Sequence, residues 1–197
     1  CACALHPAFW FAAALPCAFS GWVLWFFRDP KRTPPGRDDV MVSPADGTVS
    51  DITPIDGKSG AEGERVKIGI FMSIFNVHIN RSPCTGRVLN VTHRPGAFLD
   101  ARRPESSERN ESVTSNISYS YRGRAYIVTV RQVAGLIARR IVTTVGAGRE
   151  VAMGERIGMI KFGSRLELIV PRAVVGRVAV SPGQCVTAGE TILIETA

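Results

Sequence analysis

The longest apolar stretch of the chain lies near its start, where residues 8–27 carry no charged side chain. A helix over this stretch, at about 1.5 Å per residue, spans roughly 30 Å, the thickness of the hydrocarbon core of a bilayer. Tryptophans lie near its ends, and three basic residues follow it: Arg28, Lys31 and Arg32. The pattern predicts a membrane-associated segment over residues 1–32, with the rest of the chain on the cytoplasmic side of the cell membrane. A buried helix or a signal peptide is the alternative, and Pro16 would kink either helix.

Beyond residue 32 the pattern changes to short runs of branched and aromatic residues that are separated by Gly, Pro and Asn. Thr33-Pro34-Pro35-Gly36 has the composition of a linker and marks this change. No long segment with a helical period follows it, so residues 33–197 are predicted to form one mainly β domain. Arg122-Gly123 is typical of a hairpin turn. The predicted strands cover residues 66–72, 87–91, 113–121, 125–133 and 137–145.

A glycine pattern recurs in the last third of the chain with an offset of 35 residues. Each copy places two tight turns around one apolar anchor, and glycine suits such turns because it tolerates positive φ. This pattern resembles the hammerhead units of lipoyl- and biotinyl-type barrel-sandwich folds, which predicts that architecture for the β core. Pro44-Ala45-Asp46-Gly47-Thr48-Val49 is a candidate for a further, degenerate unit. The matched positions are Gly148, Val151, Gly154, Glu155 and Ile157 with Gly183, Val186, Gly189, Glu190 and Ile192.

The formal charge of +7 comes from 24 basic and 17 acidic residues that are spread along the 197 positions. No basic motif interleaved with aromatic residues argues for nucleic acid. A diffuse basic surface beside an apolar segment favours an anionic membrane as partner. Five cysteines without a Cys-x-x-Cys pair argue against a disulfide framework and for a reducing compartment. His6, His78 and His93 lie far apart in the sequence, so no metal site is expected.

Gly163-Ser164 lies between two strand-like apolar runs and suggests a peptide bond that cuts itself. The serine hydroxyl of such a pair can attack the preceding carbonyl to give an ester, and β-elimination then leaves dehydroalanine, which hydrolyses to a pyruvoyl group. The attack needs a base and a group that orients the base. His78 is the candidate base, and Asp46 is the candidate orienting carboxylate. The simpler interpretations, a turn-forming aspartate and a structural histidine, stay open.

Six segments carry a resemblance that extends along nearly the whole chain. They are Phe26-Phe27-Arg28-Asp29-Pro30, Ser43-Pro44-Ala45-Asp46-Gly47, residues 71–83, Glu108-Arg109-Asn110, residues 132–140 and residues 158–165. Each segment alone would be weak, but the six in this order are highly specific. The chain resembles the short form of the phosphatidylserine decarboxylases, a family that makes its own pyruvoyl cofactor by self-cleavage.

The resemblance implies a proenzyme that is cleaved at Gly163-Ser164. The products would be a large subunit, residues 1–163, and a small subunit, residues 164–197, that begins with the pyruvoyl group derived from Ser164. His78 and Asp46 fall in segments where the family places its imidazole and its acid. Longer members have two histidines around His78, and Arg81 occupies the second position here. Whether His78 serves cleavage, decarboxylation or both therefore stays open.

The implied reaction converts phosphatidylserine to phosphatidylethanolamine and carbon dioxide without a metal. The ketone would condense with the substrate amine, and the Schiff base would accept the electrons left by the departing carbon dioxide. His78 is the candidate donor of the proton that returns. Arginines are expected to bind the phosphate or the carboxylate of the substrate. The candidates are Arg81, Arg109 and Arg139, and a homo-oligomer stays open.

Two other classes of function remain. A membrane-anchored serine hydrolase would use Ser164, His78 and Asp46 without self-cleavage, but no Gly-x-Ser-x-Gly elbow surrounds Ser164. A barrel-sandwich binding module without chemistry is the other alternative. Carriers of that type present a modified lysine at a hairpin tip, and neither glycine unit centres on a lysine.

Overall fold

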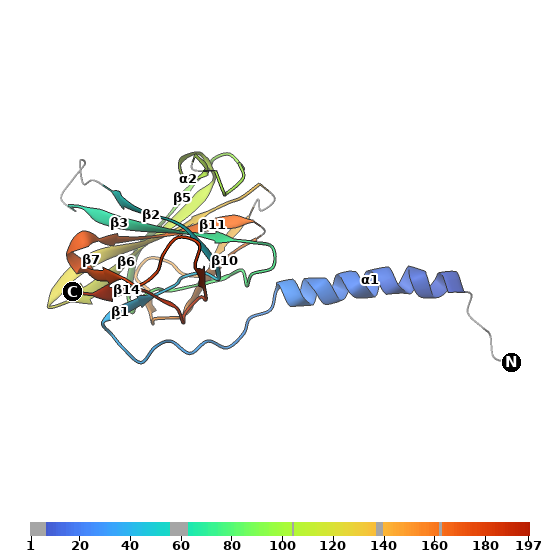
Figure 1. The fold of residues 1–197 in the computed structure, drawn as a ribbon, viewed down its shortest axis with the longest axis horizontal. Coiled ribbons are helices and arrows are strands. Elements are labelled where there is room, and N and C mark those ends of the chain that lie inside the picture. The colour runs from blue at the N-terminus through green and yellow to red at the C-terminus, as the bar shows by residue number, and fades with distance from the viewer. Residues whose placement is uncertain (1–6, 56–62, 104, 137–139, 162) are drawn as a thin grey trace.

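A long helix projects from a body built of strands (Figure 1). The computed structural model describes residues 7–55, 63–103, 105–136, 140–161 and 163–197. The helix, α1 (Pro7–Phe26), covers most of the predicted apolar segment and contains Pro16. Within those described ranges, no helix combines the length and the hydropathy that a membrane crossing requires. The predicted membrane helix is therefore not confirmed as a span.

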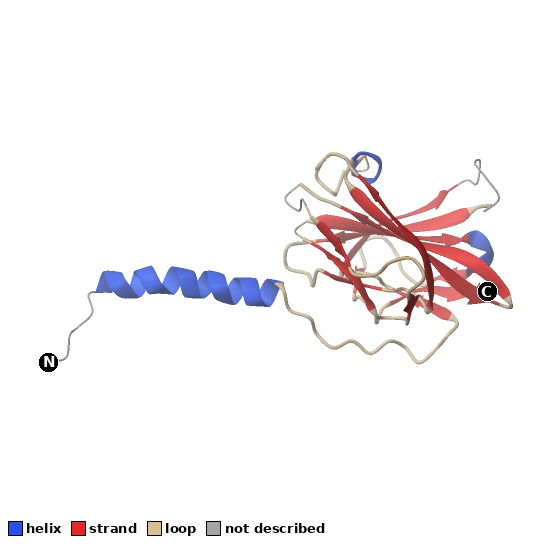
Figure 2. Ribbon diagram, turned by 180° about the vertical axis from the view of Figure 1, so that it is seen from behind, coloured by secondary structure: helices blue, strands red, loops and turns tan. Residues whose placement is uncertain are grey.

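The largest sheet has eight antiparallel strands in the order β13-β2-β3-β11-β7-β6-β5-β9. This sheet is strongly curled (Figure 2). The prediction of a mainly β domain is confirmed. The strands are β2 (Gly47–Ile55), β3 (Arg65–Met72), β5 (Gly86–Arg94), β6 (Ser112–Tyr121), β7 (Arg124–Val133), β9 (Glu150–Val151), β11 (Ser164–Pro171) and β13 (Cys185–Val186).

Two sheets of three strands complete the body, in the orders β1-β14-β12 and β4-β10-β8. A short helix, α2, follows β5, and a 3-10 turn, η1, follows β11. The predicted hairpin at Arg122-Gly123 is confirmed, since both residues have positive φ, 49° and 74°, and join β6 to β7. The remaining elements are β1 (Val40–Val42), β4 (Ile79–Arg81), α2 (Ser106–Arg109), β8 (Ile141–Thr143), β10 (Arg156–Ile160), η1 (Arg172–Val174), β12 (Val175–Val178) and β14 (Ile192–Thr196).

The strand order shows that the β domain consists of two similar halves. The sequence of one half is inserted into the sequence of the other. In the large sheet β13-β2-β3-β11 mirrors β9-β5-β6-β7, and the halves meet where β11 pairs with β7. The small sheets match in the same way, β1-β14-β12 with β4-β10-β8. The inner half, β4 to β10, is continuous in sequence and lies between β3 and β11 of the outer half. The outer half is therefore assembled from both ends of the β domain.

The repeated glycines are structural counterparts. Gly148 and Gly183 have φ of 89° and 88°, and Gly154 and Gly189 both have φ of 77°. Their backbone partners also match, because the N–H groups of Gly154 and Gly189 each donate over 2.8 Å to the carbonyl of a serine, Ser82 and Ser43 respectively. The predicted repeat is thus real.

The segment around Pro44 belongs to a different repeated turn. Ser43-Pro44-Ala45-Asp46-Gly47 has its counterpart in Ser82-Pro83-Cys84-Thr85-Gly86. In each turn the serine Oγ donates over 2.7 Å to the carbonyl two residues on. A side chain at Gly47 or at Gly86 would overlap a backbone carbonyl of the next strand, Phe71 or Ser118. The suggestion of a further degenerate glycine unit is therefore corrected to a second pair of turns.

Both faces of β11 are buried. Leu166, Leu168 and Val170 point to the core and are fully buried there. Arg165 and Glu167 point to the opposite face, where they are 5% and 0% exposed. Alternating side chains of a strand lie on opposite faces of a sheet, so β11 carries an apolar face and a buried charged face. Ser164 begins this strand on the same side as Leu166.

Replacing Gly148 or Gly183 by alanine is expected to lower the free energy of unfolding by about 1 kcal/mol, because a Cβ is disfavoured at positive φ. The two losses should agree within error, since the two units are counterparts. Equilibrium urea denaturation measures both. Gly146→Ala is the matched control, because Gly146 has open space and no positive φ, and stability should hold or rise slightly. Clearly unequal losses would contradict the equivalence of the units.

Candidate functional site

Ser164 is the first residue of β11 and is completely buried. Its Oγ donates to the Sδ of Met72, on the neighbouring strand β3, over 3.6 Å. The preceding Gly163 has φ of 58°, a conformation that favours glycine. Gly163 also lines a cavity of about 140 Å³ together with Phe71, Asp100, Arg102 and Leu136. The predicted cleavage point thus combines a left-handed glycine, a buried hydroxyl and an adjoining cavity.

A chain of amide side chains leads to the same sulfur atom. Thr143 Oγ1 donates to Gln132 Oε1 over 3.3 Å, and Gln132 Nε2 donates to Asn80 Oδ1 over 2.8 Å. Asn80 Nδ2 then donates to Met72 Sδ over 3.7 Å. A thioether is a weak acceptor, so the last donor of this chain is only weakly engaged. Ser164 and Asn80 therefore present their donors at one atom in a buried site.

His78 precedes β4 and is 1% exposed. Its ring packs on Phe26, the last residue of α1, with 4.3 Å between ring centroids. Its carbonyl accepts from the N–H of Ile160 over 3.3 Å, beside the segment that leads to Gly163. Burial lowers the pKa of His78 to about 4; a backbone hydrogen bond at Asn76 opposes this shift, and the charge of Arg28 adds to it. The imidazole is therefore neutral at pH 7, as a base requires.

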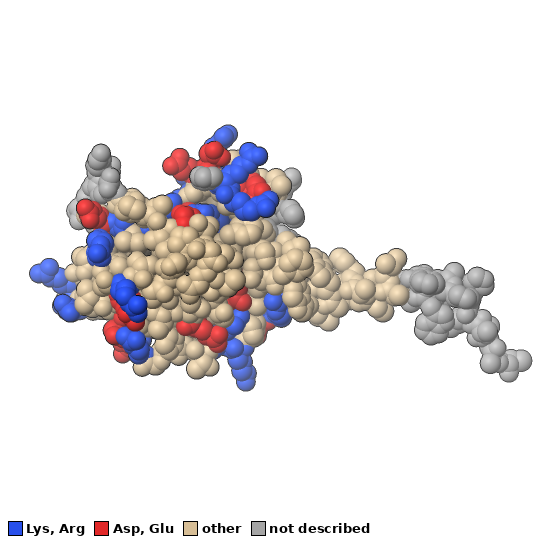
Figure 3. All heavy atoms as spheres, in the orientation of Figure 1, with Lys and Arg blue, Asp and Glu red and all other residues tan. Residues whose placement is uncertain are grey.

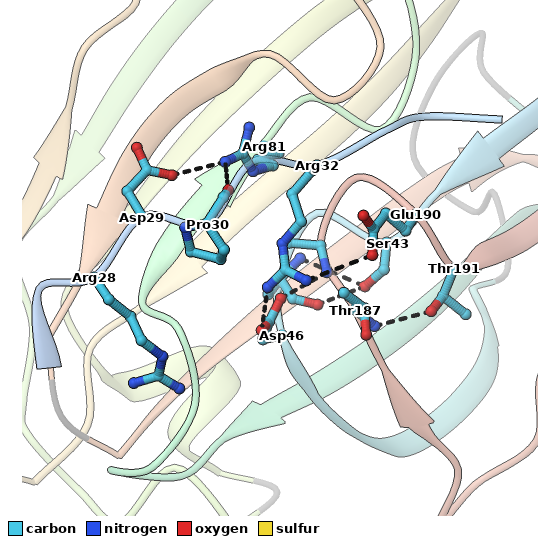
Figure 4. Close-up of polar contacts among 12 residues, drawn as sticks. Arg28, Asp29, Pro30, Arg32, Ser43, Asp46, Arg81, Thr187, Glu190 and Thr191 are labelled. Carbon is cyan, nitrogen blue, oxygen red and sulfur yellow. Dashed lines mark hydrogen bonds and ion pairs between the residues drawn. The ribbon is translucent and has the colours of Figure 1, made fainter. Parts of the chain in front are cut away.

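Asp46 lies in the turn between β1 and β2, and both of its carboxylate oxygens have partners. Arg32 Nη2 donates to Oδ2 over 2.8 Å (Figure 4), and the N–H of Ala188 donates to Oδ1 over 2.8 Å. In the other half, the counterpart Thr85 accepts from the N–H of Met153 over 3.1 Å. Through these contacts Asp46 stabilises the turn. Its role as the orienting acid stays a prediction.

The residues after α1 attach the helix to the body. Arg28 donates to the carbonyl of Phe75 over 2.9 Å, and Asp29 accepts from Arg81 over 2.8 Å (Figure 4). Arg156 forms a second ion pair with Asp29, at 2.6 Å. Together with the pair between Arg32 and Asp46, these contacts give a physical reason for the charged residues of the Phe-Phe-Arg-Asp-Pro segment, because their side chains bind the segment to the body. They hold Phe26 against His78.

The predicted phosphate-binding arginines differ in their placement. Arg81 is 7% exposed and donates over 2.9 Å to the carbonyl of Gly154, besides its pair with Asp29. Arg109 is exposed at the end of α2. Arg139 lies outside the described residues. Arg81 is therefore engaged in joining α1 to the glycine unit, and Arg102 is an arginine that lines the cavity at Gly163.

Several residues around Ser164 escaped sequence reasoning. Met72, Asn80 and Gln132 lie inside segments that carried the family resemblance, but nothing in their spacing predicts that they meet. Arg165 and Glu167 look like exposed positions of an alternating strand, although both are buried. The signal that could have indicated this is a run of apolar residues on both sides of the two charges. No cluster of three or more His, Cys, Asp or Glu suited to a metal ion occurs in the part of the chain that the structure describes.

Comparison with known proteins identifies the family. The sequence model described as "Phosphatidylserine decarboxylase" matches residues 19–194. Three similar proteins are each named "Phosphatidylserine decarboxylase proenzyme". The protein from Nitrobacter winogradskyi is 47% identical over 177 residues, which are 88% of this chain and 70% of that protein. The protein from Paramagnetospirillum magneticum is 40% identical over 192 residues, 96% and 76% of the two chains.

The third, from Azorhizobium caulinodans, is 45% identical over 177 residues, 88% and 73% of the two chains. The hydrolase and binding-module alternatives receive no support from these matches. A family match over most of the chain and relatives at 40–47% identity agree with the six segments found in the sequence. The chain therefore belongs to the phosphatidylserine decarboxylase family.

Proposed function

We propose that this chain is a proenzyme that cleaves itself between Gly163 and Ser164 and then converts phosphatidylserine to phosphatidylethanolamine and carbon dioxide. The observation that supports this best is the geometry of the pair itself. A buried serine heads a strand in the middle of the large sheet, and the residue before it is a glycine at positive φ beside a cavity. The relatives whose names include "proenzyme" agree with cleavage.

Self-cleavage uses only atoms of the chain and water. Ser164 Oγ adds to the carbonyl carbon of Gly163, the C–N bond breaks, and the serine nitrogen takes up a proton to become an amine. Removal of the Cα proton of the resulting ester then expels Gly163 as a carboxylate that keeps the former Oγ. The remaining dehydroalanine tautomerises to an imine, and water releases ammonia to leave a ketone.

The residues at the site fit a pyruvoyl group at position 164, since this position is buried and directly follows Gly163, which lines the cavity. Such a group supplies a ketone that accepts electrons during decarboxylation. The protein's part is to hold residue 164, to exclude water from it and to bind the charged headgroup. We assign Arg102 to bind the phosphate or carboxylate of the substrate, because it lines the cavity; Arg109 and Arg139 remain candidates.

Asn80 is assigned to stabilise the negative oxygen that forms when Ser164 attacks. Its amide orientation is set by Gln132, whose own amide is set by Thr143. Because its present acceptor is a thioether, Asn80 can exchange that contact for a stronger one to an oxyanion. His78, neutral and buried, is assigned as the base. The chain thus has a nucleophile, a base and a donor without drawing on Asp46.

The apolar surface around the site suits a lipid substrate. Ring contacts join α1 to the body here: Trp25 lies 6.3 Å from Phe75 between centroids, and the Lys161 ammonium lies 5.2 Å from the Phe27 ring. Figure 3 shows the described part of α1 without charged side chains, while charged side chains of both signs occur in scattered groups on the body. We assign this surface to an anionic membrane on its cytoplasmic side. The exposed apolar residues near the end of α1 and in the loops of the body include Trp25, Phe27, Ile74, Phe75 and Leu136.

The paired glycine units also support a finer description of the fold. Each unit places two left-handed turns around a two-residue strand, β9 or β13, that adds to an end of the large sheet. This arrangement agrees with a barrel-sandwich core, which we propose for the β domain.

The first test replaces Ser164 by alanine. The wild-type chain should give two masses, residues 1–163 and 164–197, and borohydride should add hydrogen to the smaller one because its ketone is reducible. Ser164→Ala should stay a single chain and release no carbon dioxide from phosphatidylserine. Intact-mass measurement under denaturing conditions reads this directly. Ser181→Ala, at an exposed serine of the small subunit, should cleave normally. Carbon dioxide release by Ser164→Ala would refute the assignment.

A second test removes the Asn80 donor. Asn80→Asp keeps the shape of the side chain but lacks the N–H group, and self-cleavage should slow by about 10²–10³-fold, as for other lost oxyanion donors. The time course of cleavage after a pulse of cell-free synthesis gives the rate. Asn116→Asp is the control, because Asn116 takes part in a similar chain from Thr129 to Asn90 that is not at Ser164. Equal rates for wild type and Asn80→Asp would exclude this role.

A third test concerns pH. The folded-state pKa of His78, about 4, lies below the ordinary value near 6.5, so the unfolded chain binds this proton more readily. The free energy of unfolding should therefore keep its full value above pH 6.5 and decline by roughly 3 kcal/mol as pH falls towards 4. Urea denaturation of the uncleaved Ser164→Ala chain measures it. In the same background His78→Gln should remove this part of the pH dependence. An unchanged profile would show that His78 does not carry the proton.

A further inference from the structure

The charged face of β11 holds a buried guanidinium one residue after the cleavage point. Arg165 Nε donates to Glu167 Oε1 over 2.9 Å, on the same strand. Its Nη1 donates to Ser50 Oγ over 3.0 Å and its Nη2 to Asp51 Oδ1 over 2.5 Å, both on β2. Because β3 lies between β2 and β11, this side chain reaches across a whole strand. Arg165 therefore links two strands that share no backbone pairing.

A glycine of β3 makes room for this link. Gly69 is registered with Glu167 on one side and Asp51 on the other. A Cβ at Gly69 would overlap the guanidinium of Arg165 and the carboxylate of Asp51. The charged groups of Arg165 and Asp51 thus lie directly over the backbone of Gly69. The absence of a side chain at this position has a clear physical reason.

The carboxylates that hold Arg165 are themselves fixed. Glu167 Oε1 accepts from Ser107 Oγ of α2 over 2.7 Å, and Arg131 of β7 lies 3.6 Å from Oε2. Burial opposes ionisation of Asp51, yet Ser50, Arg165 and Lys67 hold the pKa of this carboxyl below its ordinary value. The guanidinium is therefore clamped between charged partners from β2 and β11. It has little freedom to move.

Cleavage at Gly163 changes what holds residue 164. Its backbone pairs with Met72 on the β3 side, while pairing on the β7 side begins only with Arg165 and Val133. Once the bond to Gly163 is gone, residue 164 is a chain end with a partner on one side. Arg165 is the first residue of β11 whose backbone pairs with both neighbouring strands, and its side chain is also hydrogen-bonded.

We propose that Arg165 is a positioning residue that fixes the newly formed end of the small subunit. This inference rests on the proposed cleavage at Gly163-Ser164. Before cleavage the continuous backbone also restrains Ser164, so the clamp matters less for the self-cleavage step. Afterwards the clamp sets the direction of residue 164, and errors of about 1 Å at a reacting centre cost roughly 10²-fold in rate. The clamp should therefore act mainly on turnover.

The main variant is Arg165→Ala. Cleavage measured by intact mass should approach the wild-type extent, kcat should fall by about 10²-fold, and KM should change little. Deuterium exchange at the first amides of β11 should increase in the cleaved protein and much less in an uncleaved Ser164→Ala, Arg165→Ala chain. Arg165→Lys retains the charge but loses the fork, so it should fall between wild type and Arg165→Ala. Arg177→Ala, at an exposed arginine of the same subunit, is the control.

A second variant reaches the same guanidinium from another strand. Gly69→Ala leaves Arg165 intact but displaces its side chain, so it should reproduce the loss of kcat and the faster exchange of β11. Gly146→Ala, where a Cβ meets open space, should do neither. Agreement between two substitutions on different strands is expected only if the position of the guanidinium matters.

Chemical rescue separates positioning from a general loss of stability. A cavity of about 340 Å³ lies over the clamp and is lined by Arg165, Ser50, Asp51, Lys67 and others. Added guanidinium ion, at concentrations too low to denature, should enter this space in Arg165→Ala and restore part of kcat. It should not improve Arg177→Ala or the wild type. A misfolded variant would gain nothing from the ion.

The outcomes distinguish the two proposals. If the wild-type chain is not cleaved, the proposed cleavage is wrong. If the wild type is cleaved but Arg165→Ala retains wild-type kcat and exchange, the clamp has no positioning role. If Arg165→Ala does not fold, Arg165→Lys and Gly69→Ala decide the question. Wild-type turnover in both of these variants would overturn the inference.

Discussion

The pairing of β11 with β3 on one side and β7 on the other is the constraint on which the whole structure depends. This strand joins the two nested halves, and its inner face supplies Leu166, Leu168 and Val170 to the core. The same pairing places Ser164 at a fixed depth beside Met72. A side chain at the head of a central strand is held more firmly than one on a loop. The fold therefore fixes the position of the proposed nucleophile.

Charge is used inside this protein to join segments that are distant in sequence. Asp29 with Arg81, and Arg32 with Asp46, attach the segment after α1 to the body. In the large sheet, β2 and β11 are joined across the intervening β3 by Asp51, Arg165 and Glu167. Breaking one partner of such a buried set is costly, because the remaining charge is left without compensation. The diffuse basic composition thus conceals specific internal pairs, and the net charge alone does not indicate them.

The sequence predicted the features that depend on local geometry. Turn glycines, the Arg122-Gly123 hairpin and four of the five predicted strand runs are set by residues close together in the chain, and they were recognised. In the fifth run, 137–145, residues 137–139 lie outside the described residues and the strand covers Ile141–Thr143. The partners of Ser164 were not, because Met72, Asn80 and Gln132 come from three strands whose meeting depends on the topology. Arg165 and Glu167 were missed for a related reason: the cover over their face comes from α2, which no periodicity near β11 indicates. The family resemblance supplied the proposed cleavage point, which propensity could not.

The nesting of one half in the other has a consequence for the proposed cleavage at Gly163-Ser164. The inner half, from β4 to β10, lies wholly before Gly163 and keeps an unbroken backbone. The proposed cleavage would divide the outer half, with β1 to β3 in one piece and β11 to β14 in the other. Of the strands in the small piece, only β12 and β14 pair with each other, whereas β11 and β13 pair with strands of the large piece. The proposed cleavage would thus make the mature protein a natural case of fragment complementation, in which the fragments are made in place from a chain that has already folded.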